Sequence, residues 1–98
     1  MIRVFIANSD TVDLFVSVFD NSNGTIIPWP EGIQEKIPVM ESQINAGAVV
    51  AVDVVEDANG YCHLNIVTSD PANFSRTKTF NDQSCEAGQT IRVDLSGV

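Results

Sequence analysis

Residues 12–19 read VDLFVSVF, and this stretch decides the fold class. Aliphatic side chains occupy its even positions, from Val12 to Val18, whereas polar or aromatic side chains occupy the odd ones. Successive side chains of a β-strand point to opposite faces, so a period of two is typical of a strand with one face in a core. The stretch therefore predicts a β-strand that buries its aliphatic face.

Turn-forming residues divide the rest of the chain into further short segments of this kind. Clusters of Asn, Asp, Gly and Pro recur about every 8–12 residues, a spacing typical of β-sandwiches and barrels. The sequence therefore predicts an all-β fold with a single domain, residues 1–98. We expect a small antiparallel β-sandwich, immunoglobulin-like or Greek-key, of about seven short strands. The expected strands are residues 2–7, 12–19, 26–30, 36–44, 48–55, 61–68, 74–80 and 90–95.

Several local details accompany this prediction. Residues 8–10 form a short link, so the first two strands are expected to pair as a hairpin. Residues 26–30 contain two prolines and are expected to form an edge strand or a loop. Residues 36–44 are expected to form one or two short strands. Residues 48–55 are mostly apolar, which predicts a strand buried on both faces, and the polar residues 81–89 predict a loop.

Two nonamers resemble each other, AGAVVAVDV at residues 46–54 and AGQTIRVDL at residues 87–95. Both follow the pattern A-G-x-x-(V/I)-x-V-D-(V/L). A glycine just before a strand permits a bend with positive φ, and the alternation that follows places apolar residues in the core. We interpret the pair as two equivalent corners of one sandwich.

The charge balance narrows the classes of partner. The chain has 13 acidic and 5 basic residues, a net charge of −8. Phosphate backbones and anionic membranes repel such a surface, so we expect neither nucleic-acid binding nor membrane association. The longest apolar run is far shorter than the roughly 18 residues of a membrane span, so membrane insertion is not expected. We expect no cleaved signal peptide, and the compartment, cytoplasmic or exported, is left undetermined.

The sequence lacks the usual catalytic constellations. His63 is the single histidine and follows Cys62 in a strand, so the two side chains are expected on opposite faces. Neither the G-x-S-x-G pattern of serine hydrolases nor a phosphate-binding glycine loop occurs. We therefore expect that the protein is not an enzyme and that His63 is a half-exposed strand residue.

The two cysteines leave two alternatives open. Cys62 alternates with Leu64 and Ile66 and is expected in the core, whereas Cys85 falls in the expected loop. A disulfide between them would stabilise the fold by roughly 3 kcal/mol in the chain-entropy model. Two free thiols are the other alternative. Two cysteines and one histidine are too few for a four-ligand zinc site.

Trp29 is the main candidate for ligand binding. It lies between Pro28 and Pro30, where the chain is poorly suited to a central strand. An exposed indole offers a flat apolar face for a sugar ring or a protein contact. We predict a binding module that uses inter-strand loops, with a carbohydrate (lectin-like) or a protein as ligand. The candidate ligand-binding residues are Trp29, Asp20, Asn21, Asn23, Glu31 and Tyr61.

The acidic turn at residues 20–24 (DNSNG) is also a candidate calcium site. Oxygen-bearing side chains occur at alternate positions, and Glu31 is the twelfth residue, as in an EF-hand loop. The pattern fails at the sixth position, where Thr25 replaces glycine, but the loops of a sandwich can also supply carboxylates. Calcium is therefore the one cofactor considered. The candidate ligands are Asp20, Ser22, Glu31, Glu56 and Asp57.

An alternative function follows from the aromatic residues. Phenylalanines occur on strand faces opposite the expected core positions. Either those strands are buried on both sides, or another subunit covers that surface. The alternative is therefore a structural or assembly protein that forms a homo-oligomer through apolar strand faces. The residues concerned are Phe5, Phe15, Phe19, Phe74 and Phe80.

Overall fold

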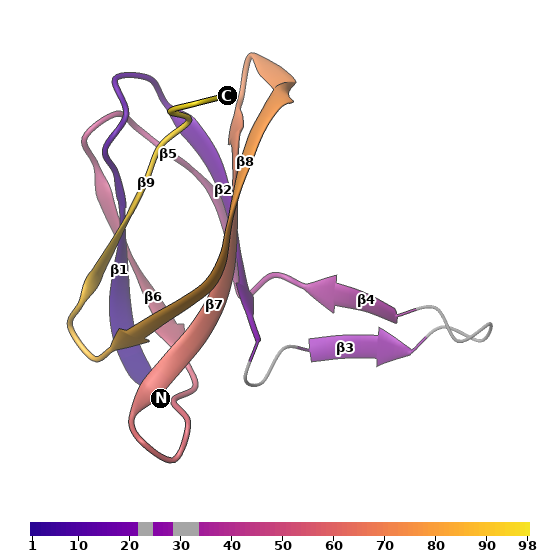
Figure 1. Ribbon diagram of the computed structural model, residues 1–98, viewed down its shortest axis with the longest axis vertical. Helices are drawn as coiled ribbons and strands as arrows, with labels where there is room; N and C mark the ends of the chain where they lie inside the picture. The colour runs from indigo at the N-terminus through magenta and orange to yellow at the C-terminus, as the bar shows by residue number, and fades with distance from the viewer. Residues whose placement is uncertain (22–24, 29–33) are drawn as a thin grey trace.

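The computed structural model describes residues 1–21, 25–28 and 34–98, with the backbone alone for 25–28 and 34–37. Every regular element in these residues is a β-strand (Figure 1). The predicted all-β class is therefore confirmed. The strands are β1 (Ile2–Asn8), β2 (Leu14–Asp20), β3 (Thr25–Pro28), β4 (Gln34–Ile37), β5 (Met40–Ile44), β6 (Val49–Val54), β7 (Tyr61–Asp70), β8 (Asn73–Glu86) and β9 (Thr90–Val93).

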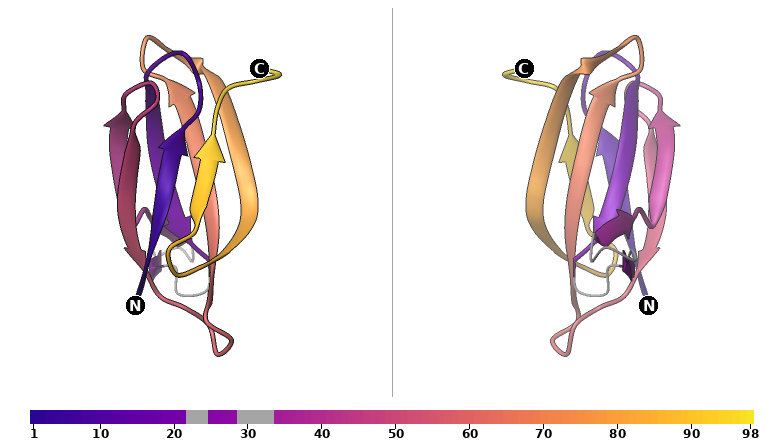
Figure 2. Two further views of the ribbon diagram at one scale, coloured as in Figure 1. Left: turned by 90° about the vertical axis from the view of Figure 1, so that its left-hand side faces the viewer. Right: turned by 90° about the vertical axis from the view of Figure 1, so that its right-hand side faces the viewer.

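Two sheets packed face to face form the sandwich (Figure 2). The three-stranded sheet has the order β6-β1-β9, and the four-stranded sheet has the order β5-β2-β7-β8. These seven strands agree with the predicted number. Among the described strands, neighbours run antiparallel, as expected for this sandwich, except β1 and β9, which run parallel.

The core lies between the inner faces of the two sheets. β2 contributes three of the four aliphatic positions of the stretch that predicted it, from Leu14 to Val18, and all three are fully buried. The prediction is wrong for Val12, which precedes β2 and is 43% exposed. β1 contributes Val4 and Ile6, which are also fully buried. Burial of a side chain of this size stabilises the fold by about 1.5–3 kcal/mol relative to exposure. The alternation within each strand therefore determines which face meets the other sheet.

The hairpin predicted for the first two strands does not form, because β1 and β2 lie in different sheets. Asn8 lies where the chain crosses from one sheet to the other, and it is almost fully buried. Its Nδ2 donates to the carbonyls of Val12 and Ile44, both at 2.9 Å, and its Oδ1 accepts from the backbone of Asp10 at 2.9 Å. A short link can join two sheets as well as two paired strands, and here a buried amide supplies the hydrogen bonds that a hairpin ladder would have made.

The strand predicted to be buried on both faces is β6, and this prediction is wrong. β6 lies at the edge of the three-stranded sheet and pairs with β1 alone among the described strands. Val52 and Val54 face the core, whereas Val49, Ala51 and Asp53 are exposed. Exposed apolar side chains are common on protein surfaces, so a mostly apolar sequence does not by itself show that both faces of a strand are buried.

The two similar nonamers lead into β6 and β9, the strands that flank β1. Gly47 and Gly88 adopt φ values of 76° and 83°, a region that costs other residues about 1–2 kcal/mol. The amide of Gly47 donates to the carbonyl of Asn8 at 3.0 Å, and that of Gly88 to the carbonyl of Arg3 at 2.8 Å. The two nonamers therefore form backbone hydrogen bonds at opposite ends of β1, which agrees with the interpretation as equivalent corners.

β8 is longer than predicted and includes most of the expected loop 81–89. The loop prediction is wrong for residues 81–86, which belong to β8: residues 83–86 pair with β7, and residues 81 and 82 lie in a register shift of that pairing. Polar side chains are compatible with this position because β8 is an edge strand of its sheet. Two register shifts interrupt the pairing, one between Leu64 and Ile66 and the other between Ser69 and Asp70.

β3 and β4 form a separate antiparallel ribbon that belongs to neither sheet. The ribbon projects from the sandwich on the side of the four-stranded sheet (Figure 1). The edge strand or loop expected for residues 26–30 is a strand as far as Pro28. The two short strands expected around Pro38 are confirmed as β4 and β5.

Candidate functional site

Part of the predicted binding set lies outside the described residues, and predictions that involve it stay predictions. These residues are Ser22, Asn23, Trp29 and Glu31. The remaining candidates lie together at one end of the sandwich, where β2 ends and the turn between β6 and β7 begins. They are Asp20, Asn21, Glu56, Asp57 and Tyr61.

Asp20 joins the two sheets. It is 2% exposed, and its Oδ2 accepts a hydrogen bond from the backbone amide of Val55 at 3.2 Å. Val55 directly follows β6, so the contact ties the end of β2 to the end of a strand in the other sheet. A buried carboxylate is stable only with such donors, and this burial leaves little of Asp20 for a ligand outside the protein.

Asn21 belongs to a polar group on the outer side of the first register shift. Its Nδ2 donates to Oδ1 of Asn65 at 2.7 Å, and the same oxygen accepts from the backbone amide of Asp82 at 2.8 Å. Asp82 has a φ of 53°, which is rare for a residue with a side chain and typical of a β-bulge. Asn65 thus holds the bulge, and Asn21 supports Asn65.

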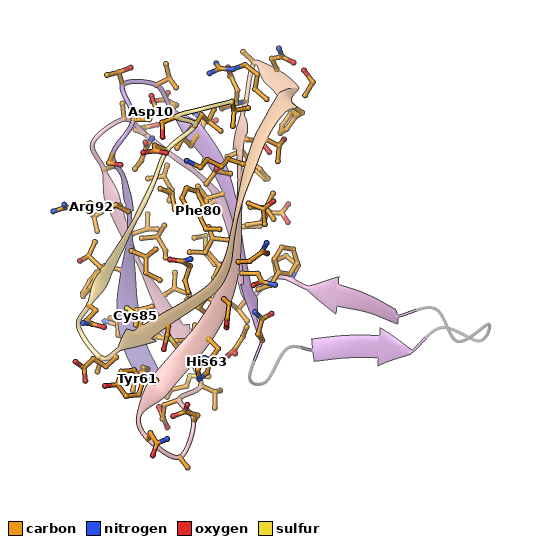
Figure 3. All side chains as sticks on the ribbon, viewed as in Figure 1. Asp10, Tyr61, His63, Phe80, Cys85 and Arg92 are labelled. Carbon is orange, nitrogen blue, oxygen red and sulfur yellow. The ribbon has the colours of Figure 1, made fainter. Side chains whose placement is uncertain are left out.

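Asp57 organises the turn that leads into β7. Its Oδ1 accepts from the amides of Asn59 and Tyr61 at 2.8 and 3.1 Å, and its Oδ2 accepts from Nε2 of His63 at 2.7 Å. The hydrogen bond from His63, followed by those from the two amides, lowers the pKa of the Asp57 carboxyl. His63 is half-exposed on β7 as expected, beside Tyr61 at this end of the sandwich (Figure 3). Nδ1 of His63 lies 4.0 Å from Asp82.

The calcium prediction gains no support from the carboxylates that the structure describes. Glu56 pairs with the amino group of Met1 at 3.3 Å, and Asp57 is occupied by three protein donors. Within the described ranges, no group of three or more histidine, cysteine or carboxylate side chains is placed to hold a metal ion. Ser22 and Glu31 lie outside these ranges.

Cys62 and Cys85 are free thiols, so the disulfide alternative is not supported. They are direct cross-strand partners on β7 and β8, and both are buried. Burial, with a smaller effect from Cys85, raises the pKa of the Cys62 thiol to about 11, and burial also raises the pKa of Cys85. Nucleophilic chemistry needs the thiolate, so the environment of both cysteines suits core packing better than catalysis.

The second register shift displays an aromatic side chain. Ser69 and Asp70 are consecutive on β7, but their partners on β8 are Thr77 and Asn73, so the three residues between those partners form a bulge. Oδ1 of Asn73 accepts from the amide and hydroxyl of Ser75 at 3.2 and 2.6 Å, and the hydroxyl of Thr77 donates to the carbonyl of Phe74 at 2.8 Å. The tied bulge leaves Phe74 62% exposed.

Phe74 packs against Phe15 on the outer side of the four-stranded sheet. The ring centroids are 5.9 Å apart and the rings are inclined by 79°, an edge-to-face contact. Phe15 pairs with Ser69, which pairs in turn with Thr77, so the contact spans the middle of the sheet. Bulges are known to redirect side chains, and here the bulge turns Phe74 back over β7.

This surface is uncharged across three strands, and we name it the aromatic face. Its members lie on β2, β7 and β8, each is an apolar or a neutral polar residue, and one of them, Ser69, is buried. Glu41 on β5 and the ion pair between Arg76 and Asp70, with an N–O distance of 3.2 Å, lie at its margin. The aromatic face consists of Phe15, Ser17, Phe19, Val67, Ser69, Phe74, Thr77 and Thr79.

A shallow hollow adjoins this face at the end near Phe15. It measures about 420 Å³ and is lined by residues of the β1–β2 link, the end of β5 and the β7–β8 turn. Gln43 in its wall is the cross-strand partner of Phe15. A second open hollow of about 410 Å³ lies between β8 and β9. The aromatic face is therefore bordered by a concave surface at the end near Phe15.

Sequence reasoning placed Phe15, Phe19 and Phe74 away from the core but missed the bulge. Phe80, in contrast, packs against the core between the sheets (Figure 3), so its assignment to the opposite face is wrong. The register shift reverses the expected phase within β8, because Phe74 and Phe80 both fall at even positions yet face opposite sides. The segment Asn73-Phe74-Ser75 carried a signal, since Asn with Ser two residues later is typical of a side-chain-tied turn.

The fold and the face together define a class, a small β-sandwich with one uncharged aromatic sheet surface. No protein-family model, curated protein or solved structure matches the chain. Among the residues that the structure describes, no helix is long and apolar enough to cross a membrane.

Proposed function

We propose that this protein is a non-enzymatic binding module whose main binding surface is the aromatic face, rather than the inter-strand loops. The observation that carries the proposal is Phe74. A bulge tied by several hydrogen bonds holds this side chain against Phe15 while leaving most of it in water. Exposing a large aromatic side chain is unfavourable, and an ordered bulge that maintains the exposure suggests a surface that a partner covers.

The composition of the face favours a protein as the partner. The centres of protein–protein interfaces are enriched in aromatic residues and depleted of charge, and their margins are polar. The aromatic face has this arrangement, with Phe15 and Phe74 in the uncharged part and Glu41 and Arg76 at the margin. The chain has a net charge of −8, yet the residues of the aromatic face carry no charge, which suits the centre of an interface.

A binding module with a carbohydrate ligand is the second candidate function. It rests on Trp29, Asn23 and Glu31, all outside the described residues, and on Tyr61, which is 41% exposed. Asp20 weakens this version because its carboxylate is buried and bonded to Val55. The protein version is therefore the one we favour.

Site-specific photo-crosslinking tests the proposal. A benzophenone amino acid is placed at Phe74 in the cells that make the protein naturally, and adducts are identified by mass spectrometry. We expect one or a few discrete protein adducts on irradiation. Phe5 provides the matched control, because it is a half-buried phenylalanine on the outer face of the other sheet. Equal adduct formation at both positions, or none at Phe74, would count against the aromatic face as the binding surface.

A further inference from the structure

We infer that the partner of the aromatic face presents a lysine or an arginine, and that this side chain enters the hollow near Phe15 and pairs with the carboxylate of Asp13. The inference rests on the proposed function, since it names the chemistry of the partner at the surface proposed there. Three observations carry it: the position of the hollow beside the aromatic face, the apolar residues in its wall, and a carboxylate in that wall to which the described part of the chain supplies no cation.

The hollow borders the aromatic face directly. On β5, Gln43 in the wall of the hollow is the cross-strand partner of Phe15, and on β7, Asp70 follows Ser69, the other partner of Phe15. The β1–β2 link and the β7–β8 turn, which supply the rest of the wall, lie at the same end of the sandwich (Figures 1 and 2). A partner that covers the edge-to-face pair of Phe15 and Phe74 therefore reaches the hollow with its adjoining residues.

The wall of the hollow suits a long aliphatic side chain. Val12 is 43% exposed there, and Pro71 and Ala72 line another part of the wall. The hollow has a volume of about 420 Å³ and is open to solvent, so it suits one side chain of a larger partner better than an enclosed small molecule. Lysine and arginine can bury their methylene groups against apolar residues while the charged group stays near water. An apolar wall that includes a carboxylate therefore matches the two parts of such a side chain.

Asp13 supplies the carboxylate for this contact. Its Oδ1 accepts a hydrogen bond from the backbone amide of Ala46 at 2.9 Å, and its Oδ2 accepts a longer one, at 3.4 Å, from Nε2 of Gln43. Among the described residues, no basic side chain forms an ion pair with Asp13. The β3–β4 ribbon, which contains Lys36, projects near the end of β2, whereas Asp13 directly precedes the start of β2 (Figure 1). Because a carboxylate oxygen has more than one acceptor site, Oδ2 can accept a further hydrogen bond from the cation of a partner.

Asp70, the second carboxylate of the hollow, already has a cationic partner. Its Oδ1 accepts from the backbone amide of Ala72 at 2.9 Å, and its Oδ2 accepts from Nη1 of Arg76 at 3.2 Å. The chain's own arginine thus pairs with one of the two carboxylates, and the net charge of −8 attracts a basic partner towards the other. An acidic side chain in the same place would meet Asp13 at close range, so the hollow also selects against acidic partners.

Photo-crosslinking in the cells that make the protein tests the inference, with the benzophenone amino acid at Phe74 and one further substitution in the chain. Asp13→Asn removes the charge but keeps an oxygen that can accept from Ala46. Asp82→Asn is the matched control, because the Asp82 side chain is 84% exposed and lies outside the hollow. We expect Asp13→Asn to lower the yield of the captured partner about fivefold and Asp82→Asn to leave it unchanged. Equal yields for the parent and Asp13→Asn overturn the inference.

A second variant, Gln43→Lys, places a cation of the chain itself beside Asp13. It should compete with the partner and lower the yield to a similar extent, whereas Thr90→Lys, which adds the same charge at an exposed position of β9, should not. Circular dichroism and thermal unfolding check that each variant is folded. Adducts that persist in both hollow variants overturn the inference and leave the proposed function standing, whereas a parent without adducts at Phe74 removes both.

The captured partner permits a direct test of the ion pair. Its lysines and arginines near the crosslinked position are replaced one at a time with methionine, and calorimetry gives the dissociation constants for the parent chain and for Asp13→Asn. One replacement should weaken binding to the parent about fivefold and binding to Asp13→Asn hardly at all, because residues in contact couple in such a cycle. Equal weakening of both complexes by every replacement overturns the pairing with Asp13.

Discussion

The outer faces of the two sheets differ more than their inner faces do. On the three-stranded sheet, Arg3 makes two hydrogen bonds to Asp53 at 2.9 and 3.3 Å, and Arg92 lies exposed on β9. On the four-stranded sheet, charged side chains such as Glu41 lie at the margin, and the centre of the surface is uncharged and displays the edge-to-face pair of Phe15 and Phe74. Both sheets bury similar aliphatic side chains inside, so the sandwich itself does not require this difference. The difference therefore does not arise from the packing of the core, and it is one of the grounds for the binding surface proposed above.

The ion pair on the three-stranded sheet contributes little to stability. The Arg3 and Asp53 side chains are 64% and 50% exposed, and solvent screens exposed ion pairs of this kind. Their main effect is to keep an edge strand soluble, because charged residues discourage the pairing of edge strands with other chains. The four-stranded sheet instead leaves its centre neutral, which is consistent with a face that exchanges water for a partner.

The largest effect is expected from a residue that joins the two sheets and belongs to neither outer face. Replacing Asn8 with alanine removes two hydrogen bonds to the carbonyls of Val12 and Ile44 and leaves these carbonyls without their donor. Each buried polar group left unsatisfied costs about 1–3 kcal/mol, so we expect Asn8→Ala to lower the free energy of unfolding by roughly 2–4 kcal/mol. Chemical denaturation of variant and parent measures the difference.

Asn45 supplies the matched control for this prediction. It is an exposed asparagine one residue beyond β5, and its replacement by alanine should change stability by less than about 0.5 kcal/mol. Equal losses from both variants would show that Asn8 does not hold the sheets together through its amide.

The next effect concerns the glycine at the corner of the first nonamer. Gly47→Ala forces a side chain into a backbone with φ of 76°, although a Cβ there would meet open space. The cost is therefore conformational alone, about 1–2 kcal/mol in the free energy of unfolding. Gly97 has a similar φ of 82° but is the second-last residue, where the backbone can readjust, so Gly97→Ala should cost much less. Equal costs at the two positions would contradict this account.

A smaller effect tests whether the aromatic pair is a unit. A double-mutant cycle of Phe15→Ala and Phe74→Ala should give a coupling energy of about 0.5 kcal/mol, the low end for aromatic pairs, because Phe74 is mostly exposed. A cycle of Phe5→Ala with Phe74→Ala should give a value near zero, since the residues lie on different sheets. The cycles are measured by denaturation at micromolar concentrations, with the monomeric state confirmed. A coupling of zero for the first cycle would mean that the bulge alone positions Phe74.

Alternation was sufficient to predict the sandwich, because the side-chain period of a strand is a local property. It placed Leu14, Val16 and Val18 inside correctly. Alternation did not predict how strands pair, because strand pairing depends on contacts between residues that are distant in the sequence. The short link after Asn8, for example, joins two sheets instead of two paired strands. Both arrangements are compatible with the same local sequence, and the choice depends on contacts that Asn8 makes with residues as distant as Ile44.

The candidate site was harder to predict than the fold. Trp29 and the acidic turn attracted attention because of residue type, but Asp20 proved to be a structural link. Phe74 was identified as lying away from the core, yet the bulge that displays it needs a register shift between Ser69 and Asp70. Such a shift changes the phase of every following side chain, and a single sequence does not reveal where it occurs.

The smallest effect that we predict concerns the charged end of the four-stranded sheet, where Asp57 and His63 stand apart from the neutral face. The hydrogen bond from His63 and those from two amides lower the pKa of Asp57 in the folded protein. A carboxyl with a depressed folded pKa contributes stability that is present above its unfolded pKa, about 3.9, and is lost as pH falls through the folded value. The difference in unfolding free energy between the parent and Asp57→Asn should therefore be constant above about pH 5 and shrink towards lower pH. Asp13→Asn, at the opposite end of the sandwich, controls for the change of net charge. A parent-to-variant difference that grows on acidification would show that the folded protein stabilises the protonated carboxyl, and this would contradict the assigned hydrogen bonds.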